Sequence, residues 1–285
     1  MGESAGPAVL VDVGADDVAW ITLNRPASMN ALSAEIVAGL LDAVDAISQS
    51  RARVVVLTAA GPVFCPGGSL TDGGASSGFS DGGVLPLETA IRKLRFSMTV
   101  AQRLHEMPQV TICMINGGCA GAGLSLACAC DLRYAVASSK FSTAFVNVGL
   151  SGDFGYSYLL PRIVGPAKAR EICFTGSKFG ADEALSMGLV SSVERDLPAL
   201  RARVAALTAK LAGGAPLALL AMKRNLLESE RQSLSEALDA EAARHAQCGA
   251  HPDAAEAGLA FLEKRRPAFS ADSLRALQPW ERARL

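Results

Sequence analysis

The sequence has little that would place the protein at a membrane or on a nucleic acid. No apolar run reaches the roughly 18 residues needed to span a bilayer. Residues 1–7 also lack the basic start and apolar stretch of a secretory signal. The 27 lysines and arginines are balanced by 28 acidic residues, so no basic surplus is available for binding phosphates. These absences predict a cytoplasmic protein with no membrane or nucleic-acid partner.

Metal-ligand spacing is missing as well, and aromatic residues make up only 5% of the chain. Cys128 and Cys130 are one residue apart, and no second Cys/His pair follows at zinc-ligand spacing. We therefore expect no metal site, and we expect the seven cysteines to be reduced, buried small hydrophobes. What is present is a hydrophobic content of 50%, mostly Ala, Gly, Leu and Val, which is enough to bury a sizeable core.

Strand and helix patterns alternate over the first two thirds of the chain, and only helices follow from Asp196 onward. Ser33 is placed as the N-cap of a helix, and one helix is expected over Leu87–His105. The expected strands are Val9–Val13, Val18–Leu23, Val54–Thr58, Val110–Ile115, Leu132–Val136 and Leu189–Val193. The pattern predicts an α/β fold with a core over residues 1–195 and a helical region over 196–285. The last helices are expected to pack on the core or on a neighbouring subunit.

Two glycine-rich turns follow two of the buried strands. The first is Phe64-Cys65-Pro66-Gly67-Gly68-Ser69-Leu70, and the second is Gly117-Gly118-Cys119-Ala120-Gly121-Ala122-Gly123-Leu124-Ser125. Small residues allow a ligand to approach the backbone closely, and a helix start points free N–H groups into the second turn. Two such turns at neighbouring strand ends can aim one N–H each at the same oxygen, as in an oxyanion hole. The alternative is that both are ordinary tight turns between a strand and a helix.

Short motifs in a fixed order resemble the crotonase superfamily, the enoyl-CoA hydratase/isomerase family, from about Val9 to about Phe269. The two turns above are among them. The others are Leu23-Asn24-Arg25-Pro26, Asn30-Ala31-Leu32, Cys130-Asp131, Val148-Gly149-Leu150, Leu160-Pro161-Arg162, Gly188-Leu189-Val190 and Phe261-Leu262-Glu263-Lys264-Arg265. The resemblance implies a spiral of ββα units with a C-terminal helical trimerisation region, a homotrimer or a hexamer built as a dimer of trimers, and an acyl-CoA substrate. It implies no separate cofactor, because coenzyme A is part of the substrate.

The resemblance also implies roles for individual residues. The backbone N–H groups of Gly68 and Ala122 match the oxyanion hole that holds the thioester oxygen. The positions matched to substrate binding are Ala27 and Met29 beside the CoA nucleotide, Pro66, Ser69, Leu70 and Gly121 in the turns, Ser125 and Phe145 near the acyl group, and Phe261 and Lys264, which reach the CoA of a neighbouring subunit in relatives. An ordinary amphipathic helix with a solvated lysine explains Phe261 and Lys264 equally well.

The match fails at the two glutamates with which enoyl-CoA hydratases activate water. Ser125 occupies the first position and Phe145 the second. A serine hydroxyl has far too high a pKa to act as a base unaided, and phenylalanine has no proton to exchange. We therefore expect little or no hydratase activity.

Asp153 is the one carboxylate left near this site. It matches the acid of some isomerases of the family, such as 1,2-epoxyphenylacetyl-CoA isomerase, and isomerisation needs only one acid/base. It also matches the nucleophilic aspartate of a family dehalogenase, so hydrolysis or dehalogenation through Asp153 is a second candidate function. A third is an acyl-CoA-binding protein without activity, in which Asp153 is only the N-cap of the next helix.

Overall fold

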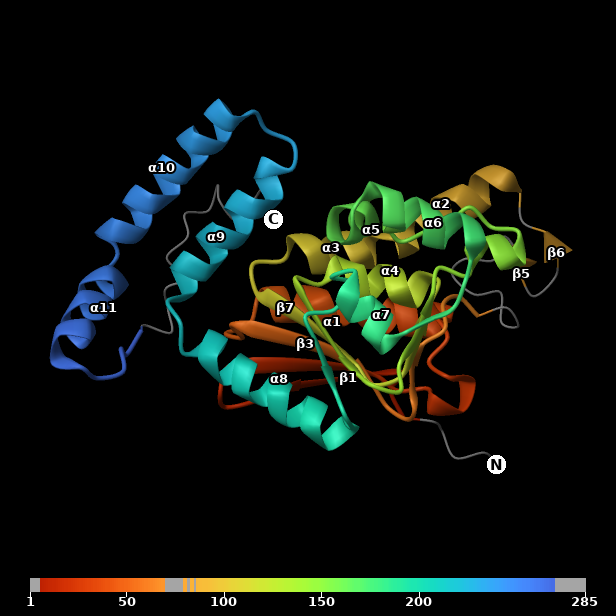
Figure 1. Cartoon of the computed structure of the whole chain (residues 1–285), viewed down its shortest axis with the longest axis horizontal. Helices are drawn as coiled ribbons and strands as arrows, with labels where there is room; N and C mark the ends of the chain where they lie inside the picture. Colours follow the sequence, from red (N-terminus) through yellow and green to blue (C-terminus); the bar gives the residue numbers. More distant parts are fainter. Residues whose placement is uncertain (1–5, 70–78, 81–82, 85, 270–285) are drawn as a thin grey trace.

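The computed structural model describes residues 6–69, 79–80, 83–84 and 86–269 of the 285-residue chain (Figure 1). Its base is a six-stranded sheet with the order β1-β2-β3-β7-β9-β12. β1 pairs antiparallel with β2, and all other neighbours in this sheet are parallel. The strands are β1 Val9–Val13, β2 Val18–Leu23, β3 Val54–Ala59, β7 Val110–Ile115, β9 Leu132–Val136 and β12 Ser192–Glu194. β3 is buried at all of its positions, as expected for a parallel strand covered on both faces.

A second, smaller sheet with the order β11-β10-β8-β4 lies beside the first. Its strands are β4 Val63–Cys65, β8 Gly118–Ala120, β10 Lys140–Ser142 and β11 Phe179–Gly180, and residues Phe79–Ser80 and Gly83–Val84 form a separate two-stranded ribbon, β5 and β6. β4, β8 and β10 each follow a strand of the large sheet, and the next α-helices in the chain are α2 (Leu87–Ser97), α4 (Ala122–Ala129) and α5 (Tyr156–Val164), with the β5–β6 ribbon lying between β4 and α2. The chain therefore repeats a ββα order, which confirms the predicted α/β spiral. Within the second predicted turn, Gly118–Ala120 form the strand β8.

The helices of the core are α1 Ala34–Ser48, α2 Leu87–Ser97, α3 Thr99–Glu106, α4 Ala122–Ala129, α5 Tyr156–Val164, α6 Pro166–Thr175 and α7 Ala181–Ser186. The Ser33 hydroxyl accepts a hydrogen bond from the Ile36 N–H, so the predicted N-cap is confirmed. The single helix expected over Leu87–His105 is wrong, because α2 ends at Ser97 and α3 begins at Thr99. The Thr99 hydroxyl donates back to the Phe96 carbonyl, and such back-bonding bends helices.

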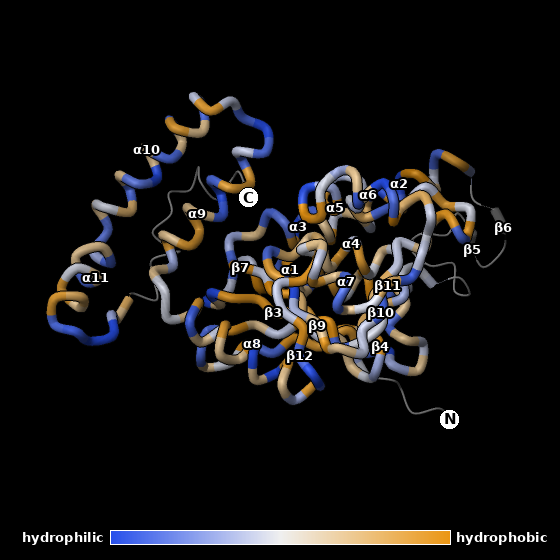
Figure 2. The backbone as a smooth tube through the Cα atoms, viewed as in Figure 1, coloured by the Kyte–Doolittle hydropathy of each residue, from blue (hydrophilic) through white to orange (hydrophobic). Residues whose placement is uncertain are grey.

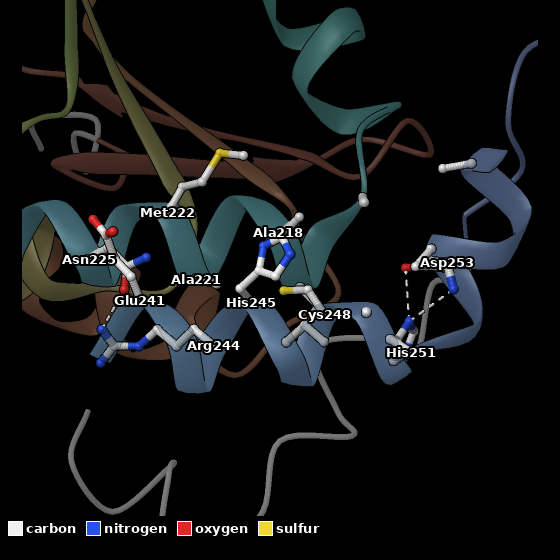
Figure 3. A pocket seen from close by; sticks show the side chains of 15 residues that line it. Ala218, Ala221, Met222, Asn225, Glu241, Arg244, His245, Cys248, His251 and Asp253 are labelled. Carbon is white, nitrogen blue, oxygen red and sulfur yellow. Dashed lines mark hydrogen bonds and ion pairs between the residues drawn. The ribbon is translucent and has the colours of Figure 1, made fainter. Parts of the chain in front are cut away.

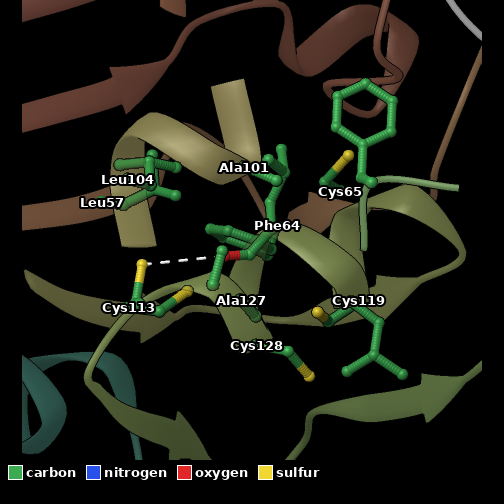
Figure 4. Close-up of a cluster of buried hydrophobic side chains, with 14 of the residues drawn as sticks. Leu57, Phe64, Cys65, Ala101, Leu104, Cys113, Cys119, Ala127 and Cys128 are labelled. Atoms are coloured by element: carbon green, nitrogen blue, oxygen red, sulfur yellow. Dashed lines mark hydrogen bonds between the residues drawn. The ribbon is translucent and has the colours of Figure 1, made fainter. Parts of the chain in front are cut away.

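All seven cysteines are free, and five of them are buried around α4 and the strands that cover it (Figure 4). Cys113, Cys119 and Cys128 contribute to the same core as Leu57 and Phe64. Burial raises the pKa of the Cys128 thiol to about 12, so this thiol stays protonated at neutral pH. These five cysteines are the buried small hydrophobes that the sequence predicts, whereas Cys173 and Cys248 are only partly buried, so the prediction that all seven are buried is wrong. Within the described residues, no group of three or more His, Cys, Asp and Glu side chains is arranged to hold a metal ion.

The helical region divides into one helix on the core and an arm. Leu200 and Val204 of α8 (Leu197–Ala212) pack against the face of the large sheet that carries Val56 and Met114. The arm consists of α9 Pro216–Ser229, α10 Leu234–Ala250 and α11 Pro252–Glu263, and it extends away from the sheets (Figure 1). Of the described helices, none alone has the length and apolar content to cross a membrane. α8 and α9 meet that criterion only as a pair, bent by 105°.

Polar contacts attach the arm to the core at two places. Lys223 of α9 is 6% exposed, and its Nζ lies 2.8 Å from the Gln109 carbonyl and 2.8 Å from Oδ2 of Asp131. The Tyr158 hydroxyl donates to Oε2 of Glu230 at 2.7 Å. Beyond these contacts the arm presents exposed apolar side chains. Figure 2 shows hydrophobic positions along α9, α10 and α11 as well as in the sheets, and the most exposed are Leu226, Leu234, Phe261 and Leu262.

Candidate active site

The first glycine-rich turn pairs with Leu32 through a short parallel bridge at Gly68. The Leu32 N–H donates to the Gly67 carbonyl at 2.8 Å, and the Ser69 N–H donates to the Leu32 carbonyl at 3.3 Å. The Gly68 N–H, which lies between these two groups in sequence, donates to no acceptor in the part of the chain that the structure describes. It is therefore available to a ligand, since alternate residues of a bridged strand point to opposite sides. Leu70, which completes the predicted turn, lies outside the described residues.

The second turn joins β8 to α4 through Gly121. Its φ of +50° suits glycine, and its N–H donates to the Ser142 carbonyl at 3.1 Å. Ala122 is the first residue of α4, where helix N–H groups have no intrahelical acceptor. Among the described residues, the Ala122 N–H donates no hydrogen bond. The positive end of the α4 dipole adds to the attraction of this N–H for an anionic oxygen.

The two turns lie against each other. A β-carbon on Gly67 would lie 3.4 Å from the Ala122 nitrogen, and one on Gly123 would lie 2.7 Å from Cβ of Cys65. The parallel pairing of β4 with β8 brings the turns to the same edge of the small sheet. The two free amides thus belong to backbone segments in van der Waals contact at one junction of the fold.

Asp153 is 5% exposed and lies in a constrained loop before α5. Gly152, Phe154 and Gly155 have φ values of +101°, +50° and +80°. The N-cap of α5 is Gly155, and the helix has no side-chain cap. Asp153 is therefore not the N-cap residue of α5, because Gly155 holds that position.

Asp153 lies close enough to the first turn to influence it electrostatically. The pKa of the Cys65 thiol is raised to about 12, chiefly by complete burial, and the nearby charge of Asp153 adds to this effect. Cys65 ends β4, directly before Pro66 and Gly67. The structure thus brings the predicted carboxylate near the predicted oxyanion turn, although the two are almost 90 positions apart in the sequence.

Ser125 and Phe145, the residues at the two hydratase glutamate positions, both lie at the second turn. Ser125 is fully buried, and its hydroxyl donates back to the Gly121 carbonyl at 3.3 Å. A β-carbon on Gly121 would lie 3.8 Å from Cε1 of Phe145. On its other side, the Phe145 ring lies against the Tyr156 ring, with 5.1 Å between centroids. Neither residue supplies a group that activates water.

Ala27 and Met29 are exposed on a 3₁₀ turn over Pro26–Ser28. Sequence reasoning missed the residue that fixes this turn, Asn30, which is fully buried. Its Nδ2 donates to the Ala60 carbonyl at 2.9 Å and to the Val63 carbonyl at 2.8 Å, and its Oδ1 accepts from the Arg25 N–H at 2.8 Å. The signal for this role was an Asn next to a turn, since Asn adopts the observed φ of +60° more readily than most residues.

Phe261 and Lys264 are not close to the turns within one chain. Both are exposed at the end of α11 on the arm, and Phe261 is 83% exposed (Figure 1). The arm also holds a separate groove of about 610 Å³ between α9, α10 and α11 (Figure 3). Its lining includes Met222, Cys248 and His251, and His251 Nδ1 lies 3.4 Å from Oδ2 of Asp253. This groove is not part of the site formed by the two turns.

Comparison with known proteins agrees with this site and fold. Residues 14–272 match the family model for enoyl-CoA hydratase/isomerase. The chain belongs to the enoyl-CoA hydratase/isomerase family. This result confirms the crotonase resemblance predicted from the sequence motifs.

Some relatives within this family are named as hydratases and others as isomerases. A "Probable enoyl-CoA hydratase" of Rhodobacter capsulatus is 36% identical over 255 residues, covering 90% of this chain and 95% of the relative. The 1,2-epoxyphenylacetyl-CoA isomerase of Escherichia coli is 32% identical over 254 residues, covering 89% and 95%. The crystal structure of an enoyl-CoA hydratase from Bacillus anthracis superposes with a TM-score of 0.85 at 28% identity, covering 93% of this chain and 99% of that one. The family is enzymatic and acts on acyl-CoA, but these names do not separate the two reactions.

Proposed function

We propose that this protein is an enoyl-CoA isomerase that moves a double bond along an unsaturated or ring-containing acyl-CoA. The observation that carries the proposal is the position of Asp153, a buried carboxylate near two contiguous turns with free amides. The N-cap position of α5 is held by Gly155 and not by Asp153. One carboxylate is sufficient for isomerisation, whereas hydration needs further groups for water.

In the proposed reaction, the N–H groups of Gly68 and Ala122 donate to the thioester oxygen. They stabilise the negative charge that develops there as an enolate forms. Asp153 removes a proton from one substrate carbon, the double bond shifts, and the protonated carboxyl returns the proton to another carbon. For a 3-enoyl thioester these are the α- and γ-carbons. The product has the same mass as the substrate, and no cofactor is consumed.

The remaining predicted contacts concern the CoA portion of the substrate. Exposed Ala27 and Met29 are proposed to line the nucleotide, and Pro66, Ser69, Leu70 and Gly121 the pantetheine arm and thioester. Phe261 and Lys264 are too far along the arm to serve the same chain, so we propose that they reach the CoA of a neighbouring subunit in a homotrimer or hexamer. The exposed apolar side chains of the arm, such as Leu226, Leu234, Phe261 and Leu262, are the surface that such an assembly would cover.

A panel of substrates tests the proposal. The purified protein is incubated with 2-enoyl-, 3-enoyl- and aryl-CoA esters, and the products are separated and weighed by mass spectrometry. The expected result is migration of the double bond with no change in mass. Gain of one water would show hydration and contradict the proposal, and release of free CoA would show the hydrolytic alternative with Asp153 as nucleophile. Binding without turnover would show an inactive acyl-CoA-binding protein.

A further inference from the structure

Tyr156 contacts both residues that precede Asp153. A β-carbon on Gly152 would lie only 2.5 Å from Cδ1 and 2.6 Å from Cζ of Tyr156, so the tyrosine ring covers the Gly152 α-carbon directly. The Tyr156 hydroxyl donates to the Ser151 carbonyl at 2.7 Å. The ring and the hydroxyl of one side chain therefore fix two consecutive residues of the loop.

Tyr156 also contacts Phe145, which lies beside the second turn. The Tyr156 and Phe145 rings lie 5.1 Å apart between centroids, and Phe145 lies against Gly121. Gly121 directly precedes the Ala122 amide. A continuous series of packed groups, from Gly121 through Phe145 and Tyr156 to Gly152, thus connects the proposed oxyanion donor with the loop of the proposed acid/base.

The loop needs such external support because its backbone conformation is unfavourable by itself. Phe154 is not a glycine, yet it has a φ of +50°, and the residues on either side of the Asp153–Phe154 pair also have positive φ. Residues in this region persist only where the surroundings hold them. Phe154 is fully buried, so its side chain anchors the loop directly after Asp153. The Tyr156 ring lies against Gly152 and holds the loop directly before Asp153.

We propose that Tyr156 is a positioning residue that holds the Asp153 carboxylate in register with the amides of Gly68 and Ala122. The role rests on the isomerase function proposed above, because it needs Asp153 to be the acid/base. Tyr156 acts through the Ser151–Gly152 backbone and exchanges no proton with the substrate. A loop shifted by about 1 Å loses much of the rate while still binding the substrate.

The test compares Tyr156→Phe with Tyr158→Phe, the same substitution two residues later on the same helix. The Tyr158 hydroxyl bonds Glu230 of the arm instead of the Asp153 loop, so it is a matched control. We expect Tyr156→Phe to lower kcat about tenfold with little change in KM, and to shift the acidic limb of the kcat–pH profile. Tyr158→Phe is expected to keep the kcat and the pH profile of the original protein.

A second measurement is independent of turnover. Amide hydrogen exchange over residues 151–155 is expected to be faster in Tyr156→Phe than in Tyr158→Phe, because only the former frees the Ser151 carbonyl. Unchanged kcat, pH profile and exchange in Tyr156→Phe would overturn the positioning role. If the original protein isomerises no substrate, the proposed function fails, and the exchange rates still decide whether Tyr156 holds the loop.

Discussion

The α-carbons of Gly67 and Gly121 face each other where the two glycine-rich turns meet. A β-carbon built on either residue would lie 3.5 Å from the α-carbon of the other. Both residues have positive φ, +114° and +50°, so an L side chain at either position strains the backbone. The distance between the Gly68 and Ala122 amides therefore depends on the absence of side chains at these two positions.

Substitution of Gly67 by alanine is expected to move the two turns relative to each other and to lower kcat about 100-fold. That is the scale of losing one oxyanion-hole donor. The measurement is steady-state kinetics on the substrate identified by the panel, with thermal unfolding to verify the fold. Gly118→Ala is the matched control, since a β-carbon at this neighbouring position would meet only Cγ1 of Val63 at an ordinary 3.6 Å. Equal kinetics for the two variants would argue against an oxyanion hole at this junction.

Asp153→Asn keeps the shape of the side chain and removes its basicity. We expect kcat to fall about 10³-fold, the scale of a lost general acid/base, while the Kd for acyl-CoA stays nearly constant. Thermal unfolding verifies that the variant keeps the fold. Full activity of the variant would exclude Asp153 as the acid/base. Turnover of the original protein in ¹⁸O-labelled water identifies the alternative mechanism, because a nucleophilic Asp153 would acquire the label.

The sequence predicted most of the larger elements, and it missed the short strands that bring the two glycine-rich turns together. Val54–Ala59 and Pro166–Thr175 have strong hydrophobic patterns and were located within a residue. β4, β8, β10 and β11 have only two or three residues each, which is too short for any periodicity to appear. They form by pairing with one another, so no local pattern could indicate that β4 and β8 bring the two turns into contact.

Asn30 shows the same limit at the level of a single side chain. Its three hydrogen bonds reach Arg25, Ala60 and Val63, two of which are about 30 positions away. We expect Asn30→Ala to lower the free energy of unfolding by about 2–4 kcal/mol, since buried backbone carbonyls lose their donors. It is also expected to raise KM, because the turn carrying Ala27 and Met29 loses its attachment. Urea unfolding and kinetics check both effects.

The control for that experiment is Asn24→Ala, six residues earlier. The Asn24 side chain makes one exposed hydrogen bond, to the Pro7 carbonyl at 3.1 Å. Its loss is expected to cost less than about 1 kcal/mol. A similar loss of stability in the two variants would mean that Asn30 contributes nothing specific to the junction between the turn and the β3–β4 connection.

His105 is expected to make the stability of the fold depend on pH. It lies in the last turn of α3 and is half-buried. Burial is the main reason why its pKa lies below the usual 6.5. Lys223 lowers this pKa further, while Glu230, Asp131 and Glu106 oppose the shift. The folded protein thus favours the neutral imidazole of His105.

The direction of the pH effect follows from proton binding. Between the lowered pKa of the folded state and the value of about 6.5 in the unfolded chain, the unfolded chain binds more protons. The contribution of His105 to stability is therefore fully present above about pH 6.5 and is lost as the pH falls through the folded-state pKa. We expect the free energy of unfolding, measured in urea at pH 7 and pH 5, to fall less in His105→Gln than in the original protein. His245→Gln, at an exposed position on α10, is the comparison variant. If both glutamine variants lose as much stability on acidification as the original protein, the desolvation of His105 is not what links the fold to pH.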